Sequence, residues 1–257
     1  PGPGGTPACG RCEHCGVVRI WGSAVAPGAW RPRPGTDPDT VHRGIRRDGQ
    51  QPIIFMQCGP TRHIAAKPEN APHDLAVTPY LLESQIDLPQ EAGIQDVFRH
   101  LATDQARTAA IAAEVMAAYG QGRKLLVLTE RTEHLDAIQT ALSDKVSTLF
   151  VLHGRASRKQ RTVLIADLNA LPPDASRVLL ATGKLVGEGF DHPPLDTLVL
   201  AMPVSWKGTL QQYAGRLHRQ HASKTDVRII DFVDTGHPAL LRMWDKRQRG
   251  YRTMGYR

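Results

Sequence analysis

Hydrophobic and polar positions divide this 257-residue chain into a first part without regular spacing and a second part with a strong pattern. From residue 91 onward, short runs of apolar residues alternate with stretches in which apolar residues recur every three or four positions. The runs predict strands, and the stretches predict helices. The predicted strands span 124–129, 147–152, 177–182, 196–201 and 226–233. The predicted helices span 91–119, as one helix or two joined ones, then 131–142, 157–168, 207–219 and the residues after 237.

Strands that are apolar at nearly every position are typical of a parallel sheet covered by helices on both faces. Their alternation with helices predicts a doubly wound α/β fold with right-handed crossovers. In such folds the functional residues lie in loops at the carboxyl ends of the strands. The residues that follow each predicted strand are therefore the first candidates for a site.

The first part of the chain shows no comparable period. Residues 1–44 are rich in proline, glycine, arginine and tryptophan, a bias that a GC-rich gene gives when it is read out of frame. We expect them to be irregular, through disorder or a non-native origin. Residues 45–90 contain one short apolar run at 52–56 and a candidate strand within 75–86. We therefore expect three parts: an irregular segment at 1–44, a segment at 45–90 that is an incomplete part of a larger unit, and a folded domain at 91–257.

Composition adds a candidate partner. The formal net charge of +7 favours an acidic binding partner, and nucleic acid comes first among these. The alternative is a basic protein without such a partner. No apolar run approaches the length of a membrane span, and the N-terminal residues lack the apolar core of a signal peptide. We therefore expect a cytoplasmic protein with no membrane contact.

Three of the four cysteines, Cys9, Cys12 and Cys15, crowd one short stretch in a C-x-x-C-x-x-C run. They are weak candidates for a zinc site, with Cys58 as a fourth ligand. Structural zinc sites usually draw on two separated pairs of ligands, and the sequence has no second pair. We expect neither zinc nor a disulfide framework.

The predicted helix at 207–219 has two distinct faces. At about 100° per residue, Gln212, Arg216 and Arg219 fall on one stripe, and Gly215 beside them leaves room for close approach. The opposite stripe is apolar and consists of Leu210, Tyr213, Ala214 and Leu217. A guanidinium group binds phosphate oxygens in pairs and stays charged, so the polar stripe is a candidate anion site. The alternative is a solvated basic face.

A second candidate follows the predicted strand at 177–182. Thr182 and Gly183 would end that strand, where a hydroxyl group and main-chain N–H groups can meet a phosphate. Glu188 then lies between two glycines that permit a sharp bend, and Asp191 follows. The alternative is an ordinary loop rich in glycine and proline.

These segments resemble the second RecA-like domain of superfamily 2 helicases and translocases. QYAGRLHR at 212–219 is similar to motif VI of that family, LLATGKLVGEGFD at 179–191 to motif V, and KLLVLTER at 124–131 to motif IV. LHG at 152–154 occupies the place of a loop that contacts nucleic acid. The order and spacing agree over residues 90–257, and the form looks closest to DEAD/DEAH-box helicases of the type III restriction-subunit kind.

The resemblance implies a role for each matching position. Arg216 and Arg219 look like arginine fingers that reach the phosphates of ATP, with Gln212 as their positioning partner. Residues similar to those of the nucleotide site are Glu188, Gly189 and Asp191. Residues similar to those that contact the tracked strand are Thr182, Gly183, His153 and Gly154.

The same resemblance implies partners that this sequence does not supply. In the family, ATP and Mg²⁺ lie between two RecA-like domains, and the first domain brings a phosphate loop, G-x-x-x-x-G-K-[ST], and an acidic motif. Neither motif occurs here, although residues 45–63 resemble the end of such a domain. The resemblance therefore implies that 45–90 is a remnant of the first RecA-like domain followed by a linker. We therefore expect a C-terminal half that acts on nucleic acid, DNA in preference to RNA, and is inactive without a first domain. The alternative is an ATP-independent module that binds nucleic acid or protein.

Overall fold

The computed structural model describes residues 74–83, 88–89, 92–183, 192–204, 207–219, 221 and 224–257. Residues 70–257 form one compact unit, and it carries every described helix and strand. The predictions for residues 1–44, and for the zinc candidates Cys9, Cys12, Cys15 and Cys58, lie outside the described residues.

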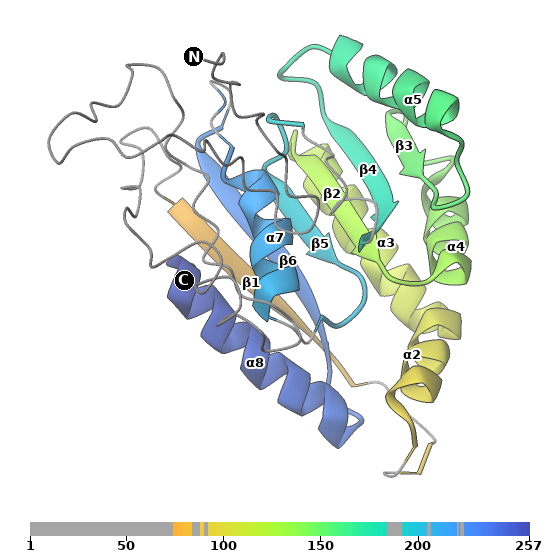
Figure 1. Cartoon of the computed structure of the whole chain (residues 1–257), viewed down its shortest axis with the longest axis vertical. Helices are drawn as coiled ribbons and strands as arrows, with labels where there is room; N and C mark the ends of the chain where they lie inside the picture. Colours follow the sequence, from red (N-terminus) through yellow and green to blue (C-terminus); the bar gives the residue numbers. More distant parts are fainter. Residues whose placement is uncertain are drawn as a thin grey trace, which may run out of the picture. The chain divides into compact units, whose positions relative to one another are not determined.

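A parallel sheet of six strands forms the centre of the unit (Figure 1). The strands are β1 (Asp74–Leu82), β2 (Lys124–Thr129), β3 (Leu149–Leu152), β4 (Arg177–Thr182), β5 (Thr197–Leu200) and β6 (Asp226–Asp234). They lie in the order β1-β6-β5-β2-β4-β3, and every paired strand runs parallel to its neighbour. Every residue of β2, β4 and β5 is buried, which explains their nearly continuous apolar runs. The predicted doubly wound α/β fold is confirmed.

Helices cover both faces of the sheet (Figure 1). They are α2 (Ile94–Thr103), α3 (Gln105–Gly120), α4 (Thr132–Leu142), α5 (Arg158–Ala170), α7 (Lys207–Leu217) and α8 (Pro238–Met254). Because successive strand residues point to opposite sides, the sheet forms two cores. One core packs α3 and α4 against the sheet, and the other packs α5, α7 and α8 against the opposite face. A smaller cluster joins α2 to the first turns of α8.

The hydrophobic pattern located the elements well and their ends less well. β2 and β4 begin and end where predicted, whereas β3 starts at Leu149. The stretch 91–119 forms two helices, because Asp104 follows α2 and caps α3. The Asp104 side chain accepts a hydrogen bond from the main-chain N–H of Arg107 at 3.0 Å, as a helix N-cap does.

The two edge strands of the sheet, β1 and β3, differ in what lies beside them and in length. Along β1, the main-chain N–H of Arg257 donates to the Leu75 carbonyl at 2.9 Å, and its carbonyl accepts from the Val77 N–H at 2.7 Å. The chain end therefore pairs with one edge. The other edge is β3, which has 4 residues, a length that limits pairing with other chains. β1 lies within the segment 45–90 of the predicted organisation and joins the sheet of the domain that follows it.

None of the helices in the described ranges is long and apolar enough to cross a membrane.

Candidate functional site

The carboxyl edge of the sheet brings together the residues that follow β3 and β4. Leu152 pairs with Ala181, so His153 and Thr182 lie on neighbouring strand ends. A β-carbon built on Gly154 would lie 4.0 Å from the hydroxyl oxygen of Thr182. The four residues that resemble nucleic-acid contacts therefore lie side by side, although they come from two loops.

The two loops differ in exposure. Gly154 is exposed, and His153 is half-buried with its Nδ1 3.8 Å from the Asp136 carboxylate. Thr182 is 8% exposed, and Gly183 is buried. A ligand that approaches this edge of the sheet therefore meets the loop after β3 first and reaches the end of β4 beneath it.

Helix α7 sits with one face in the core, as its spacing predicts. Leu210, Ala214 and Leu217 are at most 1% exposed. On the other side, Gln212 is exposed and Arg216 is half-buried. The helix contains no acidic residue. It therefore holds an amide and a guanidinium group where both are accessible, a donor set that suits an anion.

Arg219 lies beyond this helix. α7 ends at Leu217, and the Lys224 ammonium nitrogen donates to the carbonyl oxygens of Leu217 and Arg219 at 2.7 and 2.8 Å. A cation at this position satisfies carbonyl groups that a helix end leaves unpaired. The prediction that Arg219 continues the helical stripe of Gln212 and Arg216 is therefore wrong. A turn places its half-buried side chain instead.

Tyr213 connects α7 to the end of β4. The residue is 5% exposed, and a β-carbon on Gly183 would lie 2.9 Å from Tyr213 Cζ and closer still to the Tyr213 hydroxyl. Burial, and then the charge of the Glu130 carboxylate, raise the pKa of Tyr213 to about 12. Sequence reasoning placed Tyr213 on the apolar stripe and missed Glu130. The position of Glu130 directly after β2 was the only feature of the sequence that could have identified this residue.

Two other residues of the motif segments are engaged within the fold. Arg131 Nη2 donates to the main-chain carbonyl of Gln95 at 2.9 Å. The Nε2 atom of His218 lies 2.8 Å from the Tyr256 hydroxyl, and the two rings stack with centroids 5.5 Å apart. Both residues therefore help to hold elements together at the margin of the candidate site.

The candidate nucleotide residues Glu188, Gly189 and Asp191 lie outside the described residues. The described residues stop at Gly183 and resume at His192. Within the described ranges, no group of three or more histidine, cysteine, aspartate or glutamate side chains could hold a metal ion.

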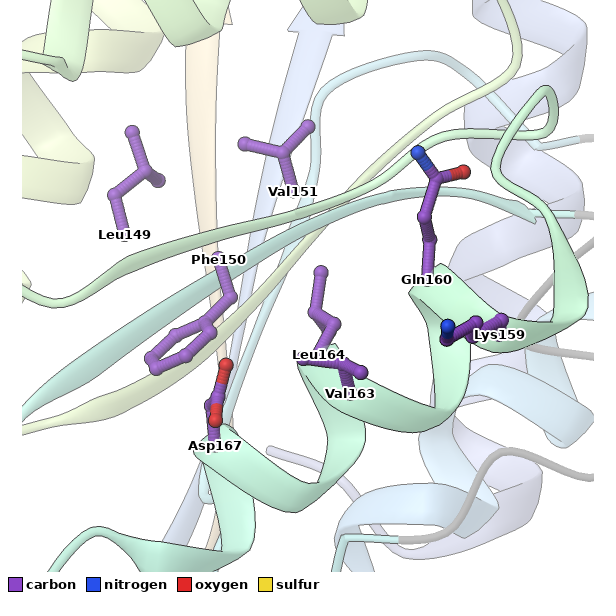
Figure 2. A pocket seen from close by; sticks show the side chains of 8 residues that line it. All are labelled: Leu149, Phe150, Val151, Lys159, Gln160, Val163, Leu164 and Asp167. Carbon is purple, nitrogen blue, oxygen red and sulfur yellow. The ribbon is translucent and has the colours of Figure 1, made fainter.

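A groove of about 400 Å³ lies elsewhere, over the outer edge of β3 (Figure 2). Leu149 and Val151 extend to one side of the strand, and Phe150 points to the other side, toward α5. The helix contributes Lys159, Gln160, Val163, Leu164 and Asp167. None of these residues belongs to the predicted site.

The sequence of this chain is similar to those of known proteins. The family model of the helicase conserved C-terminal domain matches residues 107–221, from α3 to just beyond α7. Uncharacterized protein 108L of Invertebrate iridescent virus 3 is 37% identical over 98 residues, which make up 38% of this chain and 88% of that protein. Probable helicase D10 of Escherichia phage T5 is 26% identical over 136 residues, 53% of this chain and 29% of D10.

The crystal structure of T4 UvsW has the same fold, with a TM-score of 0.56 at 18% identity over 71% of this chain. The chain belongs to the family of the helicase conserved C-terminal domain. The matched region includes α7 and the ends of β3 and β4. This helicase domain spans 29% of D10 and 40% of UvsW, so both of those proteins extend far beyond it.

Proposed function

We propose that this helicase domain is the C-terminal half of an ATP-dependent motor that moves along nucleic acid, preferably DNA. Arg216 and Arg219 bring positive charge to the phosphates of an ATP molecule that a first RecA-like domain holds. Gln212 positions these arginines. The loops after β3 and β4 contact the backbone of the tracked strand through His153, Gly154, Thr182 and Gly183.

The position of α7 carries this proposal, because the helix packs on one face of the sheet and reaches the carboxyl end of β4 through the contact of Tyr213 with Gly183. Its buried apolar face leaves Gln212 and Arg216 accessible on a helix without acidic residues. In open α/β sheets, ligands bind beyond the carboxyl ends of the strands, where the strand order reverses. Here the order reverses at β2, because β4 and β3 lie on one side of it and β5 lies on the other.

ATP with Mg²⁺ fits the donors that this helicase domain offers. Guanidinium groups stabilise the charge that develops on a transferring phosphoryl group, and bound ATP supplies that group. The share of this chain is Arg216, Arg219 and Gln212, together with Glu188, Gly189 and Asp191. The phosphate loop and the Mg²⁺ ligands belong to the first domain.

The test joins the full chain to the first RecA-like domain of a superfamily 2 helicase and measures ATP hydrolysis with and without single-stranded DNA. We expect DNA-stimulated hydrolysis that Arg216→Ala lowers by about 10³-fold or more, the range for arginine fingers. Arg216→Lys also loses most activity, because an ammonium group lacks the planar fork. The control Arg242→Ala, at an exposed position of α8, keeps the wild-type rate. Hydrolysis that persists in Arg216→Ala would contradict the proposal.

The alternative, an ATP-independent nucleic-acid-binding module, predicts different results for the same proteins and variants. The full chain alone would then bind single-stranded DNA with strong dependence on salt. Arg216→Ala and Arg219→Ala would leave that affinity unchanged, and the fused protein would not hydrolyse ATP. Single-stranded RNA, measured in parallel, decides between the two nucleic acids.

A further inference from the structure

We propose that Tyr213 is a positioning residue that couples the candidate nucleic-acid contacts at the end of β4, Thr182 and Gly183, to the arginine-bearing helix α7. This inference rests on the proposed function, because it assigns strand binding to one end of the contact and ATP hydrolysis to the other. It adds a residue that neither motif similarity nor charge singles out.

The Tyr213 ring occupies the space in which any other residue at position 183 would carry its side chain. A β-carbon there would lie 2.9 Å from Cζ and 3.6 Å from Cε2 of the ring, and closest of all to the hydroxyl oxygen. Position 183 therefore requires a glycine because Tyr213 packs on it, whether or not a ligand also requires one there. A glycine lets the helix side chain rest directly on the backbone at the end of β4.

Neither the ring nor the helix has space to move aside. Tyr213 is 5% exposed and belongs to the larger core of the domain. One turn earlier on α7, the Leu210 side chain lies against α8, where a β-carbon on Gly250 would be 2.9 Å from Leu210 Cδ2. α7 is thus held closely by the end of β4 and by α8. Since a packed core deforms little, a shift of Gly183 displaces the helix as a whole.

The helix carries such a shift to the candidate catalytic groups. Arg216 follows Tyr213 by three residues, a spacing that makes their side chains neighbours on the helix surface, and Gln212 directly precedes it. Glu130, at the end of β2, lies near enough for its charge to act on the phenol. A strand bound at the end of β4 and the geometry of Arg216 become linked, which is a coupling between two sites.

The test uses the full chain joined to a first RecA-like domain and compares ATP hydrolysis with and without single-stranded DNA. Gly183→Ala forces a methyl group against the ring, and we expect stimulation by DNA to fall about fivefold or more. Tyr213→Leu, which removes the ring, also lowers the stimulation. In the double variant the methyl group has room, so the combined loss is smaller than the product of the single losses. The matched control Gly120→Ala, with nothing within 4 Å of the new β-carbon, keeps the wild-type stimulation.

Thermal unfolding of each variant separates positioning from folding. A purely structural contact would lower the melting temperature and leave the stimulation factor unchanged, and that result overturns the proposal. Tyr213→Phe, which keeps the ring and removes the hydroxyl, gives the same test if Tyr213→Leu does not fold. An active fused protein whose stimulation these variants do not affect refutes the coupling alone. A wild-type fused protein without DNA-stimulated hydrolysis refutes the proposed function and the coupling together.

Discussion

Arg107, Arg177 and Arg247 are at most 2% exposed, although arginine is among the residues that proteins bury least often. Arg107 Nε lies 2.8 Å from the Asp234 carboxylate, and Arg247 Nε lies 2.7 Å from that of Asp231. Each of these ion pairs ties a helix to β6. The positive charges concerned are thus used inside the fold.

Replacing Arg107 by methionine removes the ion pair that it forms with the buried Asp234 carboxylate. We expect the free energy of unfolding, measured by urea denaturation, to fall by about 3–5 kcal/mol, as when one member of a buried pair is removed. The comparison is Arg99→Ala, which breaks an ion pair with Asp96 whose side chains are 64% and 52% exposed. That loss should stay below about 0.5 kcal/mol. Equal losses in the two variants would show that burial does not control the contribution of these pairs.

At the scale of elements, two glycines outside α7 determine where that helix lies. Gly183 admits Tyr213 at the end of β4, and Gly250 admits Leu210 on α8. Periodicity predicted which face of α7 is buried, because burial follows the helical repeat directly. The same periodicity contains nothing about the surfaces that this face meets, since those belong to other elements.

Gly250→Ala tests this account of helix packing. The new β-carbon would meet Leu210 Cδ2 at 2.9 Å inside the core, and overpacking of this kind costs about 1–3 kcal/mol. A helical glycine replaced by alanine gains about 1 kcal/mol, so we expect a net loss and a lower melting temperature. Gly120→Ala, where the β-carbon meets nothing within 4 Å, should leave the melting temperature unchanged or higher. A rise in both variants would contradict the close contact between α7 and α8.

The ends of elements were harder to predict than their centres. α2 and α3 separate because the Asp104 side chain accepts a hydrogen bond from the Arg107 N–H, and α7 ends at Leu217, whose carbonyl group accepts a hydrogen bond from Lys224. Each of these ends depends on one or two specific hydrogen bonds. A hydrophobic repeat averages over many residues and does not record such bonds, which is why the sequence extended α7 to Arg219.

At the scale of the whole molecule, two buried histidines make the stability depend on pH. Burial, and then the charge of Arg107, lower the pKa of His134 to about 3. Burial, and then Arg177, lower the pKa of His192 to about 4. The unfolded chain binds these protons near the ordinary value of 6.5, whereas the folded chain does not. The fold therefore loses stability as the pH falls below that value, until the pH reaches the pKa of the folded state.

Urea denaturation at about pH 7.5 and about pH 5.5 measures this effect. Between the two conditions, each histidine should lower the free energy of unfolding by about 1.4 kcal/mol, the equivalent of one pH unit of uncompensated proton binding. His134→Leu and His192→Gln should each remove about that share of the pH dependence, whatever they do to stability at neutral pH. A pH dependence that stays at the wild-type value in both variants would contradict the assignment.

By itself, the sequence determined the parallel α/β fold, the positions of its strands and the two faces of α7. Continuous apolar runs and helical spacing reflect burial at each residue, so these features can be read along the chain. The motif order also indicated the helicase family that the comparisons show. All of this information is local or depends on the succession of elements.

Only the tertiary structure decided which residues meet. The strand order places the ends of β3 and β4 side by side, Tyr213 rests on Gly183, and Arg107 reaches an aspartate 127 positions away. Such contacts join residues that are distant in the chain, and a single sequence carries no pattern that links them. For the same reason, the sequence counted every arginine as a charge, whereas the fold buries Arg107, Arg177 and Arg247 and pairs Arg107 and Arg247 with aspartates of β6.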